Sequence, residues 1–135
     1  MALFEWTQEY SVSVQRFDTE HKKLFALISE LNDAMSEGRG RFVVARVLHE
    51  LNEYAHWHFS GEESAMQRAG YAGVDEHIAE HRDFISKIDQ FYSGYDGTQT
   101  GVTIDVLYFL RDWLLKHILH TDRRYSESLN RAGIH

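Results

Sequence analysis

The sequence contains no cysteine and no proline. Without thiols, disulfide bonds and thiolate metal sites are both excluded. Any metal ion must therefore be held by imidazole and carboxylate groups. Because proline is absent, glycine is the residue that divides the chain into segments.

The sequence also lacks long apolar runs and clusters of basic residues. No apolar stretch approaches the ~18 residues that a membrane span requires, and the first residues lack the basic-then-apolar pattern of a signal peptide. The net charge is −7, and no block of Lys and Arg suggests a phosphate-binding face. We therefore expect a cytoplasmic monomer without a membrane or nucleic-acid partner.

The composition is that of an ordinary folded protein. Of the 135 residues, 43% are apolar, 26% are charged and 13% are aromatic. This length suits one domain with a proper core, and the aromatic content argues against disorder. We expect a single domain over residues 1–135.

Glycines cluster at 38–40, 70–73 and 94–101, and no strand-like alternation persists between these clusters. The pattern predicts an all-α fold, an antiparallel up-down-up-down four-helix bundle with an N-terminal arm and a short C-terminal helix. The expected segments are an arm over 1–17, helices from about Asp18 to Glu37, Arg41 to Arg68 and Val74 or Asp75 to Ser93, a fourth helix from about Val102, and a short helix from Asp122 to Arg131.

Two of these expectations concern the start of the chain. Leu3, Phe4, Trp6 and Tyr10 make the arm too apolar for a loose tail, so we expect it to pack across the bundle. Asp18 is a residue type that often caps a helix N-terminus, and it is the expected cap of the first helix.

The stretch 58–81 carries two pairs of potential metal ligands, His58 with Glu62 and His77 with His81. Residues four apart on a helix lie ~40° apart around its axis, so each pair presents two ligands on one face. A turn containing Gly70 and Gly73 makes the two helices antiparallel neighbours. The two pairs can then face each other across one core.

Histidines on the apolar stripes of the other two helices extend this pattern. His21 follows the inward stripe of the first helix and His117 that of the fourth, whereas His49 and His56 lie ~160–180° from His58, on the outer face. One buried histidine is usually structural, but five on converging stripes beside a carboxylate indicate a metal site. Imidazole and carboxylate suit iron, zinc, copper or manganese, and the set is large enough for two metal ions bridged by carboxylates.

The chain resembles the bacterial hemerythrins, a family of non-heme di-iron proteins that bind oxygen. The resemblance covers about residues 4–126, and its motifs follow the family's order and approximate spacing. They are FEW at 4–6, FDTEHKKLF at 17–25, HFSGEESAM at 58–66, HIAEH at 77–81 and RDWLLKHILHTD at 111–122.

The resemblance implies reversible dioxygen binding, without enzymatic turnover, at two iron ions joined by an oxo or hydroxo bridge. The residues that match the family's ligands are His77, His81 and His117 on one iron, His21 and His58 on the other, and Glu62 and Asp122 as bridges. It also implies that Leu114 lines the oxygen pocket. Glu20 stands where the family often has Gln, and Ser13 where it often has Gly.

Asp122 conflicts with ideal helix geometry. It lies five residues after His117, ~140° around an α-helix, so Thr121 would face inward in its place. By spacing alone, Asp122 caps the short C-terminal helix. If it is a bridging ligand, the helix must unwind, bulge or end between the two residues. Glu63 points ~100° away from Glu62, which favours a solvated or supporting acid over a ligand.

Three other functions fit parts of the sequence. Residues 77–81 match the H-x-x-E-H signature of inverted zinc peptidases, with Glu80 as the base. A ferritin-like oxidase would use Glu-x-x-His motifs, of which residues 53–56 are an example, but His56 is on the outer face. A metal-free interaction module would leave the buried histidines unexplained. Within the family resemblance, oxygen storage, delivery or sensing, peroxide or nitric oxide handling, and iron storage all stay open.

Overall fold

The computed structural model describes residues 5–94 and 100–135, without the side chains of residues 100–103. The expectations for Leu3, Phe4 and Gly97 fall outside this part of the chain. The four long helices are α1 (Gln15–Ser36), α2 (Gly40–Ala69), α3 (Val74–Gly94) and α4 (Thr100–Lys116). After α4 come a π-helical turn (His117–Thr121), a 3-10 turn (Asp122–Tyr125) and the short helix α5 (Ser126–Arg131).

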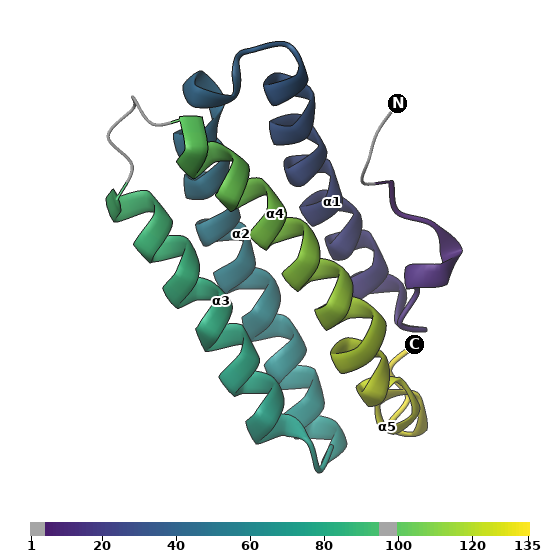
Figure 1. The fold of residues 1–135 in the computed structure, drawn as a ribbon. Coiled ribbons are helices and arrows are strands. Elements are labelled where there is room, and N and C mark those ends of the chain that lie inside the picture. Colours follow the sequence, from purple (N-terminus) through teal and green to yellow (C-terminus); the bar gives the residue numbers. More distant parts are fainter. Residues whose placement is uncertain (1–4, 95–99) are drawn as a thin grey trace.

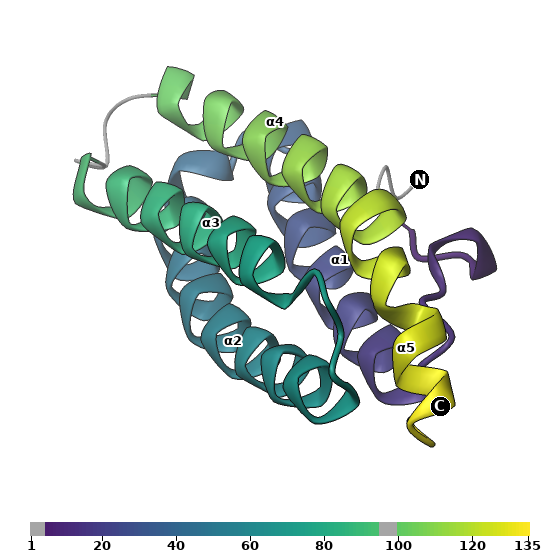
Figure 2. The same cartoon turned by 90° about the horizontal axis from the view of Figure 1, so that it is seen from below.

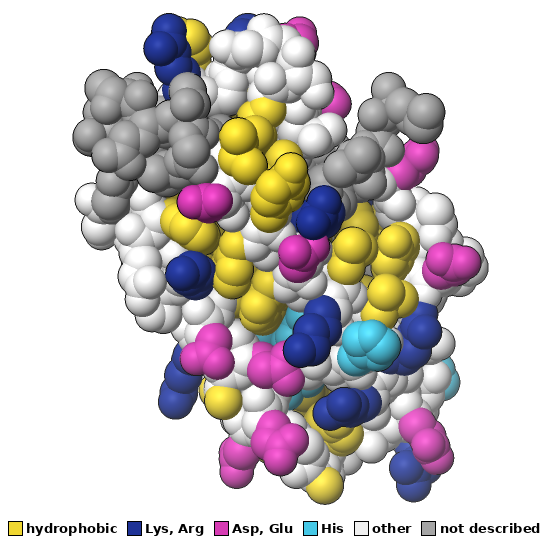
Figure 3. Space-filling view, viewed as in Figure 1, with side chains coloured by type: hydrophobic (Ala, Val, Ile, Leu, Met, Phe, Trp, Pro, Cys, Tyr) yellow, Lys and Arg dark blue, Asp and Glu magenta, His cyan; other side chains and the backbone are white. Residues whose placement is uncertain are grey.

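Successive long helices run in opposite directions and form a four-helix bundle (Figure 1). Figure 2 shows α5 beside the purple N-terminal segment, at the end of the bundle where α1 begins. The all-α up-down-up-down prediction is therefore confirmed. None of the described helices is long and apolar enough to cross a bilayer. Acidic and basic side chains are interspersed on the face shown in Figure 3.

The interior of the bundle has an apolar half and a polar half. Near the α1–α2 turn it is filled by aliphatic residues, including Leu31, Val44 and Leu48, which are fully buried. At the opposite end the buried residues include histidines and carboxylates. Burial of the apolar stripe is worth ~25 cal/mol per Å² of surface removed from water, so the aliphatic half contributes to the stability of the bundle.

Glycines end the first two helices as the sequence predicts. Gly38 and Gly70 have positive φ angles of 74° and 67°, a left-handed conformation that costs glycine little. At the end of α2, the N–H of Gly70 donates to the carbonyl of Gln67 and the N–H of Tyr71 to that of Met66. These bonds satisfy carbonyls that the helix leaves open, and they fix the turn that brings α3 alongside α2.

The expected cap at Asp18 is wrong. Helix α1 begins at Gln15, with Val14 as its N-cap, so Asp18 already lies inside the first turn. Its carboxylate accepts hydrogen bonds from the N–H of Val12 at 2.8 Å and the hydroxyl of Ser11 at 2.6 Å. These bonds to the arm replace the capping role that the spacing suggested.

The arm packs along α1 and α5. The Tyr10 ring lies 5.0 Å from that of Phe25, and the Lys22 ammonium lies 4.5 Å from the Trp6 ring. From α5, the Ser126 hydroxyl donates to the carbonyl of Val12 at 2.6 Å. The arm therefore ties the start of α1 to the end of the chain, as its apolar character predicts.

Ser13 is the one described non-glycine residue with a positive φ, 60°. For residues with a Cβ this conformation costs roughly 1–2 kcal/mol. We predict that Ser13→Gly raises the free energy of unfolding by about 0.5–1 kcal/mol, the relief being partly offset by the greater entropy of unfolded glycine. Guanidinium titration measures the change.

Ser13→Ala is the matched control, because alanine keeps the Cβ and loses only the hydroxyl. It should leave the unfolding midpoint close to that of the wild type. A stabilisation by alanine as large as that by glycine would show that the backbone angle is not the cause.

Candidate metal centre

The antiparallel arrangement brings the histidines to one end of the bundle. His21 lies early in α1, His58 in the second half of α2, His77 and His81 early in α3, and His117 directly after α4. All of them face the interior, together with Glu62 and Asp122, and each is at most 2% exposed. We call these seven residues the His–carboxylate cluster. His49 and His56 are exposed on the outer face of α2, as the periodicity predicts.

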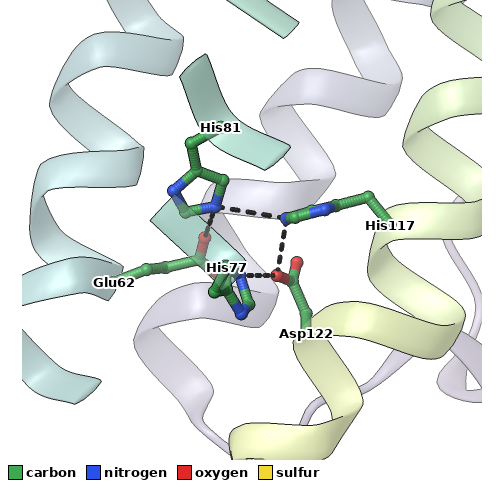
Figure 4. Close-up of side chains that lie close together, drawn as sticks. All are labelled: Glu62, His77, His81, His117 and Asp122. Carbon is green, nitrogen blue, oxygen red and sulfur yellow. Dashed lines mark hydrogen bonds and ion pairs between the residues drawn. The ribbon is translucent and has the colours of Figure 1, made fainter. Parts of the chain in front are cut away.

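Five members of the cluster form one potential metal position (Figure 4). The Nε2 atoms of His77 and His117 lie 2.8 and 2.9 Å from Oδ1 of Asp122. His81 Nε2 lies 3.3 Å from Oε1 of Glu62 and 3.2 Å from Nε2 of His117. One donor atom from each of the five residues falls within 4.8 Å of all the others. Three imidazoles and two carboxylates therefore converge on one point.

His21, His58 and Glu62 form a second such position beside the first. His58 Nε2 lies 3.3 Å from Oε1 of Glu62, and His21 Nε2 lies 3.3 Å from Oε2. The second oxygen of Asp122, Oδ2, lies 3.2 Å from His21 Nε2. Each carboxylate therefore lies between the two groups of histidines and is placed to bridge two cations.

The donor atoms of the cluster fit metal ions better than they fit one another. His21 Nε2, His77 Nε2, Glu62 Oε1 and both Asp122 oxygens are buried without an aligned hydrogen bond, although neighbouring donors lie about 3 Å away. Buried polar atoms normally have partners. Close spacing without alignment is expected when lone pairs point at a common centre. Imidazole with carboxylate is a donor set for iron, zinc, copper or manganese.

A local change of helix type places Asp122 in the cluster. The backbone from His117 to Thr121 is π-helical, and a 3-10 turn begins at Asp122. A π-turn adds a residue to each turn, so the residue five positions after His117 shares its face, whereas an α-helix would place it ~140° away. The bulge that a ligand role for Asp122 would require is present. Thr121 is also buried, and its hydroxyl donates to Glu80.

Carboxylates hold the outer nitrogens of three of the histidines. Nδ1 of His58 lies 2.5 Å from Glu20, that of His81 lies 2.8 Å from Glu63, and that of His117 lies 3.1 Å from Glu80. Such a partner fixes the ring orientation and tautomer and makes Nε2 a stronger donor to a metal. Glu63 is therefore a supporting acid rather than a solvated one, and its position ~100° from Glu62 around the helix allowed both roles.

The sequence interpretation missed the roles of Glu20 and Glu80. Glu20 drew attention only as a departure from the family pattern, and Glu80 only as the base of a peptidase motif. The carboxylate of Glu80 accepts hydrogen bonds from His117 and from Thr121, so it is not free to act as a base. An acid one residue before an inward-facing histidine was the available signal in both cases. The partner lies on another helix, however, and spacing does not identify it.

Gly61 has a packing role that explains a glycine within α2. A Cβ at this position would lie 2.5 Å from a guanidinium nitrogen of Arg16. With hydrogen there instead, Arg16 lies close to the helix and its Nε donates to Glu20 at 2.9 Å. The other oxygen of Glu20 holds His58, so Gly61 helps to position that carboxylate.

Tyr125 was not predicted as part of the site. It is fully buried, and its hydroxyl donates to Oε2 of Glu62 at 2.6 Å. Burial and the nearby carboxylates of Glu62 and Asp122 raise the pKa of Tyr125 well above its usual value, so it remains a donor. It stabilises the oxygen of Glu62 that faces His21, whereas Oε1 faces His58 and His81.

Opposite charges compensate one another within the cluster. Burial lowers the pKa of His21, but Asp122 and Glu62 outweigh it and raise that pKa to about 10. Burial has the same effect on His117, and Asp122 and Glu80 raise its pKa to about 9. Burial raises the pKa of Glu62, but His58, His21 and His81 hold it well below its usual value. A metal ion bound here would therefore displace protons from His21 and His117.

Apolar and aromatic side chains surround the cluster. The Phe59 ring stacks on His81 with centroids 3.8 Å apart, and the Trp113 ring stacks on His117 at 4.3 Å. Leu114 is 3% exposed. A surface groove of about 640 Å³ between α2 and α3 reaches His81 past Phe59 and Glu63.

Comparison with known proteins agrees with this geometry. The model of the hemerythrin HHE cation-binding domain matches residues 12–128. A bacteriohemerythrin of Methylococcus capsulatus is 33% identical over 131 residues, which cover 96% of this chain and 99% of that protein. A myohemerythrin of Theromyzon tessulatum is 27% identical and covers 93% of each chain.

The solved structures give the same result. The crystal structure of a wild-type hemerythrin superimposes with a TM-score of 0.84 at 32% identity, covering 95% of this chain and 98% of the other. The residues that the family model matches, 12–128, include all seven residues of the His–carboxylate cluster. The chain therefore belongs to the hemerythrin family.

Proposed function

We propose that this protein binds dioxygen reversibly at a carboxylate-bridged di-iron centre held by the His–carboxylate cluster. The observation that supports the proposal is the unequal division of imidazoles between the two positions. His77, His81 and His117 converge on one, and only His21 and His58 on the other, with Glu62 and Asp122 between them.

This inequality leaves room for a small ligand. If both carboxylates and a solvent-derived oxo or hydroxo group bridge the ions, the position with three imidazoles has one more protein donor than the other. The metal position beside His21 and His58 would then have one open coordination site. Iron held by these residues would supply the two electrons that dioxygen takes up on binding and returns on release.

The surrounding residues favour binding over turnover. Five imidazoles make the centre histidine-rich, unlike the carboxylate-rich sites of ferritin-like oxidases. Leu114, which is buried, and the rings of Phe59 and Trp113, which stack on His81 and His117, would limit the access of water and so slow oxidation of the oxygen complex. Glu20, Glu63 and Glu80 fix the imidazole rings of His58, His81 and His117. Among the described residues, no free acid lies beside the cluster in the place of a peptidase base, since Glu80 is held by His117 and Thr121.

Iron content and a reversible spectrum test this function. Protein reduced without oxygen and then aerated should contain about two irons per chain and change its visible absorption reversibly over repeated cycles. We predict that His58→Ala and His117→Ala each reduce bound iron and lower the thermal midpoint, because metal binding is coupled to folding.

His49→Ala and His56→Ala are the matched controls, since both side chains are exposed on α2. They should bind iron like the wild type. Equal iron loss in both pairs would contradict the assignment of inner and outer histidines. Sustained consumption of peroxide or nitric oxide, in place of reversible binding, would identify the chain as a redox enzyme.

Leu114 tests the apolar pocket. It is buried three residues before His117 in the chain, and Leu114→Ala would leave a cavity that admits water. We predict that this variant keeps its iron but autoxidises several-fold faster than the wild type, as followed by the decay of the oxygenated spectrum in air. An unchanged rate would show that Leu114 does not protect the bound oxygen.

The raised histidine pKa values predict how the stability of metal-free protein depends on pH. His21 and His117 have folded-state pKa values of about 10 and about 9, above the unfolded value near 6.5. The folded chain therefore holds more protons than the unfolded chain between pH 6.5 and 10. The stability from these groups is fully present below pH 6.5 and is lost as the pH rises through 9 and 10.

Guanidinium titrations of metal-free protein at several pH values measure this loss. Zinc-loaded protein is the control, because the metal replaces the protons and should flatten the decline. A metal-free protein that gains stability between pH 7 and 10 would contradict the assigned shifts.

A further inference from the structure

Trp57 connects the surface of α2 to the His–carboxylate cluster. Its side chain is 55% exposed, unusual for a residue type that is highly buried on average. The ring centroid of Tyr54 lies 5.6 Å from that of Trp57. The Tyr54 ring lies in turn nearly parallel to His58, at 6.4 Å and 6°. Two oxidisable rings therefore link solvent to an imidazole of the cluster.

Arg16 holds these rings in place. Its guanidinium lies 5.8 Å from the centroid of the Trp57 ring, and its Nε donates to Glu20 at 2.9 Å. The other oxygen of Glu20 holds Nδ1 of His58 at 2.5 Å. Arg16 and Glu20 thus connect the indole at the surface to the imidazole in the cluster and hold both in position.

Small molecules can reach this point of the surface. A hollow of about 390 Å³ lies between α1 and α2, with Tyr54 and Trp57 among its lining residues. Lys23, Glu50 and Glu53 complete its polar rim. A dissolved one-electron donor can therefore approach the indole without approaching the buried cluster.

We propose that Trp57, coupled through the Tyr54 ring to His58, carries oxidising equivalents from the metal centre to the protein surface. The inference rests on the proposed function, because it requires iron in the cluster. Its role is protective, since oxidising equivalents that stay in the cluster would attack the histidines that hold it.

The electrons balance with hydrogen peroxide as oxidant and ascorbate as reductant. After peroxide has oxidised the centre, Trp57 gives up one electron, which passes by way of Tyr54 and His58, and the indole N–H proton goes to water. Ascorbate then returns one electron to Trp57, and water returns the proton. Two such transfers supply the two electrons that, with two protons, reduce one peroxide to two waters.

The oxidising equivalents reach the surface at Trp57 rather than stopping at Tyr54. The Tyr54 hydroxyl donates to the backbone carbonyl of Glu20 at 3.1 Å. A carbonyl is a weak base that does not take up the phenolic proton, so an oxidised Tyr54 is readily restored by Trp57. The exposed indole has water as a proton acceptor.

The test maps oxidised side chains by mass spectrometry after brief exposure to hydrogen peroxide, with and without ascorbate. Oxidation of Trp57 should be several-fold higher in iron-loaded than in zinc-loaded wild-type protein, and ascorbate should suppress it. Trp57→Phe keeps a ring against Tyr54 but is hard to oxidise. In this variant, oxidation should move to Tyr54 and the cluster histidines, and iron should be released several-fold faster.

Tyr92→Phe is the matched control, because Tyr92 is 52% exposed on α3, almost as much as Trp57. It should leave the pattern of oxidation and the iron release unchanged. Equal Trp57 oxidation with iron and zinc would overturn the inference alone. So would preferential oxidation of Trp113, whose ring stacks on His117. A chain that takes up no iron would overturn the proposed function as well.

Discussion

Burial of seven ionisable side chains in one small volume constrains the rest of the structure. Glu62 and Asp122 have essentially no contact with solvent, and neither would stay ionised there without compensating charge. The surrounding imidazoles supply that charge and hold the pKa values of both acids well below their usual range. Removing one partner leaves an uncompensated buried charge, which is strongly destabilising. The residues that form the candidate metal centre therefore also determine the stability of the polar half of the bundle.

The supporting carboxylates follow a regular order along the chain. His58 on α2 is held by Glu20 on α1, His81 on α3 by Glu63 on α2, and the histidine after α4 by Glu80 on α3. In each case the acid comes from the preceding helix. Ring orientation in the cluster is thus fixed by the packing of neighbouring helices, so a shift of one helix disturbs the donors on the next.

The two halves of the bundle have different tasks. The aliphatic half stabilises the antiparallel helices by burial, whereas the other half holds converging donors that lack aligned partners. The Phe59 ring stacks on His81, and the Tyr54 ring lies near both His58 and the exposed Trp57.

The sequence by itself determined the bundle, the inward faces of His21, His58, His77, His81 and His117, and the outward faces of His49 and His56. These features depend on the period of a single helix, which the order of residues records. Only the tertiary structure decided the start of α1 at Gln15, the π-turn that brings in Asp122, and the partners of Glu20, Glu80 and Tyr125. Such contacts join residues of different helices, or depend on a local departure from the α-helix, and neither follows from spacing within one regular helix.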